Sequence, residues 1–323
     1  MQRESSLDIA RAVSMLYIIG VWHLNNYTDS YSLQPYGEYI KNAALGLFMF
    51  LSGYLLGGRY IIKDRSSAYS FFKKRIFRIF PLFAVSLIIS YAIGKIAFST
   101  LFLGLTGISV FIPPLPLTLW FVSMIVVFYM LFPLLSGKSK KQQIFISLAI
   151  TVIALLWTVY FGGLEKRFVY YFPCFALGVI IADIKICDLL NLKRAVICLL
   201  IFVLLSVVYE LWGLNWADWR FIIGRPFIAL SGAAVIIVMS MYLSKIRGIA
   251  RISVPIAYAS MCAYLFHRVI FKVFRDDIYW PEDGWMRLLY LSAVCLPVII
   301  SVGYLVQYIY DKIISKISVK AGY

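Results

Sequence analysis

Long apolar stretches separated by short polar gaps run through this sequence from end to end. A helix that crosses the hydrocarbon core of a bilayer needs about 20 mostly apolar residues. Only 14% of the residues are charged and 62% are hydrophobic, whereas a soluble domain carries about 25% charged residues. The chain is therefore predicted to be an all-α, polytopic transmembrane helix bundle. The spans that we expect cover approximately residues 7–24, 41–61, 81–98, 117–135, 144–161, 168–184, 195–211, 221–243, 252–273 and 288–310.

The distribution of basic residues predicts the topology. Lysine and arginine gather in the loops after the second, fourth, sixth and eighth expected spans and in the C-terminal tail. Basic loops face the cytoplasm, so both termini are expected there, with about ten spans. This clustering also accounts for the net charge of +16, and no nucleic-acid partner is expected. No linker or repeat marks a second domain, so residues 1–323 are predicted to form one membrane domain.

Residues 99–117 are apolar but do not resemble a span. Two glycines and then Pro113, Pro114 and Pro116 interrupt the segment, which is too short for a comfortable crossing. We expect a re-entrant or interfacial segment. Counting it as another span would place the basic loops that contain Lys138 and Lys245 on the outer side, against the positive-inside rule.

The five cysteines are scattered and form no CxxC motif, which argues against a disulfide framework and a zinc site. No metal site is expected. The tryptophans all fall at expected outer ends or outer loops. They fit an interfacial aromatic belt or, alternatively, platforms for a sugar-like ligand. These residues are Trp22, Trp120, Trp157, Trp212, Trp216, Trp219, Trp280 and Trp285.

The only two histidines, His23 and His267, both lie in apolar segments. At about 1.5 Å per residue, His23 lies about 24 Å and His267 about 22 Å from the inner ends of their spans. Both are therefore expected at nearly the same depth, in the outer half of the membrane. A neutral imidazole can accept a proton near neutral pH. It can equally form a structural hydrogen bond between helices, which is the favoured interpretation for His267.

Two pairs of charged residues flank expected spans. Arg75 and Arg78 are three residues apart on one helix face, where guanidinium groups could bind phosphates or lipid headgroups. Asp8 and Arg11, at the start of the first span, could form a local ion pair that anchors the helix.

Five motifs, in order along most of the chain, resemble the acyltransferase-3 family of integral-membrane acyltransferases. The first contains Leu7, Asp8, Arg11 and His23, and the second is Phe48–Tyr54, which includes Ser52-Gly53. The third is Phe71–Pro81, similar to an RxxRxxP segment. The fourth begins Leu119-Trp120-Phe121 and includes Tyr129 and Pro133. The fifth is Ser260–His267, similar to SxxxYLxH. No acidic residue directly follows Trp120. Some members of the family append a soluble extracytoplasmic esterase-like domain, and we expect the type without one.

The resemblance implies a membrane O-acyltransferase with His23 as its catalytic residue. It implies that Arg75, Arg78 and Arg11 bind the donor. Supporting roles are expected for Asp8, Ser52, Trp120, Tyr129, Ser260, Tyr264 and His267. The co-substrate would be an acyl-CoA, in the simplest case acetyl-CoA, with no permanently bound cofactor. The acceptor would be a glycan or lipid-linked sugar. We expect a multi-pass protein of a bacterial plasma (inner) membrane, in contact with its lipids.

A second class of function also fits a helix bundle with an aromatic outer vestibule: a transporter or exporter of polysaccharide or lipid-linked sugar. Transporters commonly carry internal repeats and ionisable groups near the midplane. This sequence shows no repeat, and its histidines lie away from the centre. The enzyme is therefore the favoured hypothesis.

Overall fold

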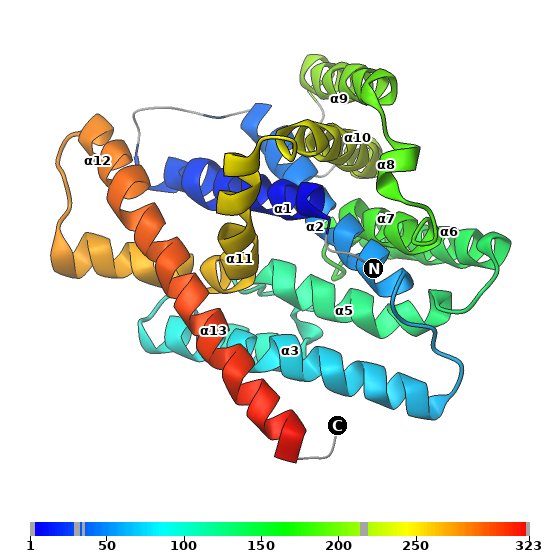
Figure 1. Ribbon diagram of the computed structural model, residues 1–323, viewed down its shortest axis with the longest axis horizontal. Coiled ribbons are helices and arrows are strands. Elements are labelled where there is room, and N and C mark those ends of the chain that lie inside the picture. Colours follow the sequence, from blue (N-terminus) through cyan, green and yellow to red (C-terminus); the bar gives the residue numbers. More distant parts are fainter. Residues whose placement is uncertain (1–3, 29–32, 34–35, 214–218, 321–323) are drawn as a thin grey trace. The chain divides into compact units, whose positions relative to one another are not determined.

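The computed structural model describes residues 4–28, 33, 36–213 and 219–320. All regular secondary structure in these ranges is helical (Figure 1). The long helices are α1 (Ser5–Tyr17), α2 (Tyr36–Gly57), α3 (Arg65–Ala92), α5 (Trp120–Leu135), α6 (Lys140–Leu156), α7 (Arg167–Ile180), α9 (Leu192–Leu211), α10 (Trp219–Leu243), α11 (Arg247–Val273) and α13 (Leu296–Lys320). Short helices are α4 (Phe98–Thr106), α8 (Ile186–Leu189) and α12 (Gly284–Tyr290). Single turns of 3₁₀ or π geometry follow or precede several of them, at Ile18–Trp22, His23–Asn26, Ile108–Val110, Trp157–Phe161, Phe274–Ile278 and Leu291–Cys295.

The predicted all-α membrane fold is confirmed. Over the described residues, 8 helical segments are long and apolar enough to cross a membrane. Two shorter apolar helices, α5 and α7, coincide with the predicted fourth and sixth spans. Within residues 99–117 the longest helix is the nine-residue α4, about 14 Å long, which agrees with the expectation that this segment is not a full span. The cytoplasmic location of the termini stays a prediction.

The chain divides into two compact units. Unit 1 comprises residues 1–41 and 239–323, and unit 2 comprises residues 42–238. In unit 1, α11 packs against both α1 and α13. Small residues allow the helices to approach closely: Gly303 of α13 lies against the backbone of Ala263 in α11, and Gly20 lies against Leu296. Such small-residue contacts are typical of helices that associate in a membrane.

Unit 2 is held together by close helix contacts around an aromatic core. Helix α5 packs against α3, α6 and α7. The core between these helices is rich in fully buried phenylalanines, namely Phe71, Phe128, Phe132, Phe172 and Phe175. Helices α2 and α7 meet at Gly53 and Gly178, where each glycine faces the backbone of the other helix. Asn42 of α2 donates a hydrogen bond to the carbonyl oxygen of Arg225 in α10, at 3.0 Å.

The start of α3 differs from the sequence-based prediction. We expected a basic loop up to Arg78 with Pro81 near the beginning of the span, but the helix already begins at Arg65. Asp64 caps it: its carboxylate accepts a hydrogen bond from the backbone N–H of Ser67, whose hydroxyl in turn accepts from the N–H of Asp64. This reciprocal capping box stabilises a helix start. The basic residues of the segment therefore lie on a helix, and Pro81 lies inside it.

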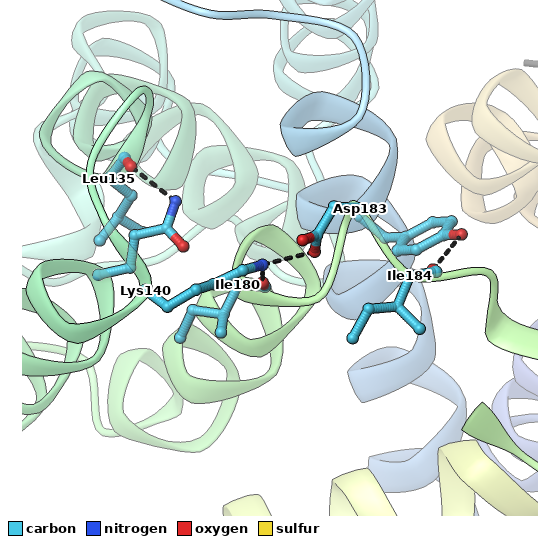
Figure 2. Close-up of polar contacts among 7 residues, drawn as sticks. Leu135, Lys140, Ile180, Asp183 and Ile184 are labelled. Carbon is cyan, nitrogen blue, oxygen red and sulfur yellow. Dashed lines mark hydrogen bonds and ion pairs between the residues drawn. The ribbon is translucent and has the colours of Figure 1, made fainter. Parts of the chain in front are cut away.

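Hydrogen bonds and an ion pair stabilise the end of α7 and the turn after it in unit 2 (Figure 2). The Lys140 ammonium forms an ion pair with Asp183 at 2.5 Å and donates to the carbonyl oxygen of Ile180 at the end of α7. The hydrogen bond from Lys140 holds the pKa of the Asp183 carboxyl below its usual range. Nearby, the Tyr54 hydroxyl donates to the carbonyl oxygen of Ile184 at 3.0 Å. The contact from Lys140 satisfies a carbonyl group that the end of α7 leaves without a helical partner, and the contact from Tyr54 holds the turn that follows α7.

Candidate active site

The two histidines of the chain form one stacked pair in unit 1. The rings of His23 and His267 lie 4.7 Å apart between centroids, with 2° between their planes. His23 is 7% exposed and His267 is fully buried. Sequence reasoning predicted a common depth, and the structure adds direct contact between the imidazoles. Two titratable rings buried against each other in a membrane protein are costly to place, which makes this pair a candidate functional site.

The tautomer of His267 follows from its hydrogen bond. Its Nδ1 lies 2.7 Å from the carbonyl oxygen of Tyr264, one turn earlier in α11. A carbonyl oxygen can only accept, so Nδ1 carries the proton and the Nε2 of the neutral ring has a free lone pair. This Nε2 is buried without a hydrogen-bond partner among the described residues, as is the Nδ1 of His23. The pair can therefore accept protons or hydrogen bonds from a bound molecule.

A change of helix geometry places His23. Helix α1 ends at Tyr17 and continues as a π-helical turn, Ile18–Trp22, and a 3₁₀ turn that begins at His23. Such π turns alter the register of a helix and are frequent at functional sites. The Asn26 amide donates to the carbonyl oxygen of His23 at 3.1 Å and closes this end of the helix. The backbone around His23 is thus fixed, while its ring is free to interact through Nδ1.

Tyr264 is the third predicted residue that the structure brings to this place. Its ring lies 5.7 Å from that of His267 and 6.5 Å from that of His23. The aromatic contacts continue from His267 to Phe271, at 6.1 Å, and from Phe271 to Tyr27, at 5.1 Å. The fifth motif of the sequence therefore supplies one side of the histidine site.

Arg75 forms a separate cationic site in unit 2. Its Nη2 donates to the Tyr60 hydroxyl at 2.8 Å, and the guanidinium lies over the Tyr60 ring at 4.8 Å. The rings of Phe71 and Tyr129 each lie 6.0 Å from its central carbon. Its Nε is buried without a hydrogen-bond partner among the described residues. Aromatic rings thus orient Arg75 and leave donors for an anion, whereas Arg78 is exposed on the same helix.

The other predicted residues have local structural contacts. Asp8 and Arg11 approach to 4.0 Å, as expected for an ion pair three residues apart. The Ser260 hydroxyl donates to the carbonyl oxygen of Ala257 within its own helix, at 2.8 Å. Trp120 lies under the Arg167 guanidinium at 4.4 Å and stacks on Tyr171 at 6.0 Å. Ser52 is half-buried in α2, next to the close-packed Gly53.

The tryptophan pattern stays open between a belt and platforms. Trp120 is 9% exposed, while Trp212 and Trp285 are 67% and 63% exposed. The Trp280 ring lies 6.3 Å from the Tyr27 ring between centroids. The central guanidinium carbon of Arg287 lies 5.5 Å from the Trp280 ring centroid. Trp216 lies outside the described residues.

Sequence reasoning missed two residues of these sites. Tyr60 lies in an irregular segment, and no local pattern links it to Arg75. Arg268 directly follows His267 inside an apolar span, and a charge within a span is a sequence signal for function that was available. The described residues contain no group of three or more His, Cys, Asp and Glu side chains that could hold a metal ion.

Comparison with known proteins identifies the family of the chain. The family described as an acyltransferase domain, Acyl_transf_3, matches residues 4–306 and so covers both units. No curated protein and no solved structure matches the chain. The match includes His23, Arg75 and the histidine-bearing part of α11. Since it extends over nearly the whole sequence, the chain belongs to the acyltransferase-3 family and is a multi-pass membrane acyltransferase.

Proposed function

We propose that this protein is an O-acyltransferase that moves an acyl group, acetyl in the simplest case, from cytoplasmic acyl-CoA to a hydroxyl of a cell-surface glycan or lipid-linked sugar. The observation that carries the proposal is the buried pair of His23 and His267, with ring nitrogens that have no partner among the described residues. An acyl transfer to a hydroxyl needs a base within hydrogen-bond reach of that hydroxyl.

His23 is the proposed base. Its Nδ1 takes the proton as the acceptor oxygen attacks the thioester carbonyl carbon. General-base catalysis of this kind contributes about 10²–10⁴-fold, and the positioning of donor and acceptor supplies much of the remaining acceleration. His267 keeps the His23 ring in place by stacking at 4.7 Å. Its own orientation is set by the Tyr264 carbonyl oxygen.

Arg75 is the proposed phosphate-binding residue for the donor. A guanidinium has five N–H donors in a planar fork that matches phosphate oxygens. Tyr60 accepts from one of these donors and the surrounding rings fix the plane of the group. The buried Nε of Arg75 is a donor that an anion would satisfy. The exposed Arg78, three residues later, would add charge for the same anion.

The test measures transfer from radiolabelled acetyl-CoA in inverted membrane vesicles. We expect His23→Ala to lower label incorporation into the glycan fraction by at least about 10²-fold, and Arg75→Ala/Arg78→Ala to raise the KM for acetyl-CoA. The matched control is Lys74→Ala, an exposed cation on the same helix, which should behave as wild type. Competition by unlabelled butyryl-CoA and acetyl-CoA identifies the acyl group preferred.

Two results would contradict the proposal. Full transfer by folded His23→Ala would remove the base from the mechanism. Saturable binding of a lipid-linked sugar without any acyl transfer by the wild type would favour a carrier over an enzyme.

A further inference from the structure

Arg268 is a charged residue within a membrane-spanning helix, immediately after the buried His267. It lies on α11, inside the candidate span Arg247–Ile278. Its Nε is buried and has no hydrogen-bond partner among the described residues. A cation in a span is costly unless a charge or a polar group compensates it, so such residues usually have a function.

The neighbouring cations of the same helix end show what Arg268 lacks. Lys272 and Arg275 both bind the carboxylate of Asp276, each at 2.5 Å. The carboxylate of Asp276, about two helical turns beyond Arg268, is therefore occupied by other cations. Within the described part of the chain, Arg268 forms neither an ion pair nor a hydrogen bond through its side chain. Its charge is thus available to an anion that binds at this place.

Arg268 also belongs to the histidine site electrostatically. Its charge acts on the imidazoles of His23 and His267 and on the phenol of Tyr27. Three buried nitrogens of this group have no partner among the described residues: Nδ1 of His23, Nε2 of His267 and Nε of Arg268. The Nε2 of a neutral His267 ring has a lone pair because its Nδ1–H is donated to the Tyr264 carbonyl oxygen. Arg268 is the member of this trio that always donates.

The proposed acyl transfer produces negative charge beside such a base. We propose that Arg268 is a catalytic residue that donates hydrogen bonds to the oxyanion formed on the acyl carbonyl. This inference rests on the acyltransferase function proposed above. A cationic donor with a buried N–H stabilises a developing oxyanion more strongly than the same group in water does.

The complete step can be written with all atoms accounted for. The acceptor oxygen forms a bond to the thioester carbonyl carbon while its proton passes to His23. The carbonyl π electrons move to oxygen, and Arg268 binds the oxyanion. When the oxyanion collapses, the carbon–sulfur bond breaks, and the leaving thiolate takes the proton from His23. An ester and free CoA thiol result, and both side chains return to their starting states.

Kinetics of Arg268→Gln in the same vesicles test this role. We expect kcat to fall about 10²–10³-fold, as for the loss of one oxyanion donor, with the KM for acetyl-CoA and for the acceptor changed less than about threefold. Arg268→Lys keeps the charge but not the fork, so it should recover part of the activity. Methylguanidine should partly rescue Arg268→Ala. The matched control is Arg275→Gln. Arg275 forms an ion pair with Asp276, so this variant should leave kcat unchanged.

The outcomes separate this inference from the proposed function. If Arg268→Gln raises the acceptor KM and leaves kcat intact, the residue binds an anionic group of the acceptor, and the oxyanion role is wrong. If neither constant changes, the guanidinium serves lipid or solvent contact. If Arg268→Gln does not fold, the test rests on Arg268→Lys and on the rescue of Arg268→Ala by methylguanidine. Recovery of kcat in these two supports the oxyanion role, and no recovery in either overturns it. Loss of activity in His23→Ala with full activity in Arg268→Gln overturns this inference alone, whereas an inactive wild type overturns the proposed function.

Discussion

Replacing Gly53 by alanine tests whether the Ser52-Gly53 motif serves packing. A Cβ at Gly53 would lie far inside the contact distance of the Phe175 carbonyl oxygen, 2.9 Å from the carbonyl carbon and 3.2 Å from the Val179 nitrogen. Ordinary Cβ contacts begin at 3.4 Å. The carbonyl carbon alone requires α2 and α7 to separate by 0.5 Å (3.4 minus 2.9), and the closer carbonyl oxygen requires more. All three neighbouring atoms belong to the backbone, and no side chain can rotate away.

The cost of this separation follows from known overpacking effects. Extra methyl groups in a well-packed core cost about 1–3 kcal/mol, while alanine gains up to about 1 kcal/mol in helix propensity over glycine. Gly248 is the matched control, because a Cβ built there meets nothing within 4 Å. We therefore expect Gly53→Ala to be less stable than Gly248→Ala by about 1–3 kcal/mol.

Thermal unfolding of purified variants in detergent, at one scan rate, measures the difference. At about 2–4 °C per kcal/mol for a large domain, Gly53→Ala should unfold several degrees below Gly248→Ala. Gly178→Ala should act alike, because its Cβ would lie 2.7 Å from the Tyr54 nitrogen. The double variant Gly53→Ala/Gly178→Ala should lose less stability than the sum of the two single losses, because one separation of α2 and α7 relieves both contacts. Equal midpoints for Gly53→Ala and Gly248→Ala would refute the packing explanation.

Three further predictions concern single contacts. Tyr60→Phe removes the hydroxyl that accepts a hydrogen bond from Arg75. We expect a roughly 2–10-fold change in the KM for acetyl-CoA with an unchanged kcat, measured by initial rates. A fall in kcat alone would argue against a donor-binding role. His267→Phe keeps a ring for stacking but removes Nε2, so we expect a lower kcat and a shifted pH profile, whereas a wild-type profile would make the contact purely structural. Lys140→Ala breaks an ion pair whose side chains are 47% and 64% exposed. Its thermal unfolding midpoint should therefore fall only slightly, by an amount that corresponds to less than about 1 kcal/mol of unfolding free energy.

The sequence predicted those features that depend on local pattern. Each long helix coincides with an apolar run, because the bilayer requires about 20 apolar residues regardless of their packing partners. The early start of α3 was not predicted, since its first turns are polar and are held by the Asp64 capping box. A search for apolar length cannot detect a helix that extends beyond its apolar part.

The candidate sites depend on both local pattern and tertiary contact. A common depth for His23 and His267 followed from their spacing, but ring stacking at 4.7 Å depends on how α1 and α11 pack. Tyr60 contacts Arg75 from an irregular segment. In such a segment no sequence periodicity predicts the direction in which a side chain points. The favoured structural interpretation of His267 now has to account for its buried, unpartnered Nε2.

Charged and polar atoms identify function better here than hydrophobic pattern does. In a chain that is 62% hydrophobic, apolar residues fill both the core and the lipid-facing surface, so their positions distinguish little. A buried nitrogen without a partner has a large desolvation cost in either setting. His23, His267 and Arg268 have such nitrogens in unit 1, and Arg75 has one in unit 2. An acyl transfer needs a proton acceptor and a donor for the oxyanion, together with a group that binds the donor phosphates, and these four residues offer the matching chemistry.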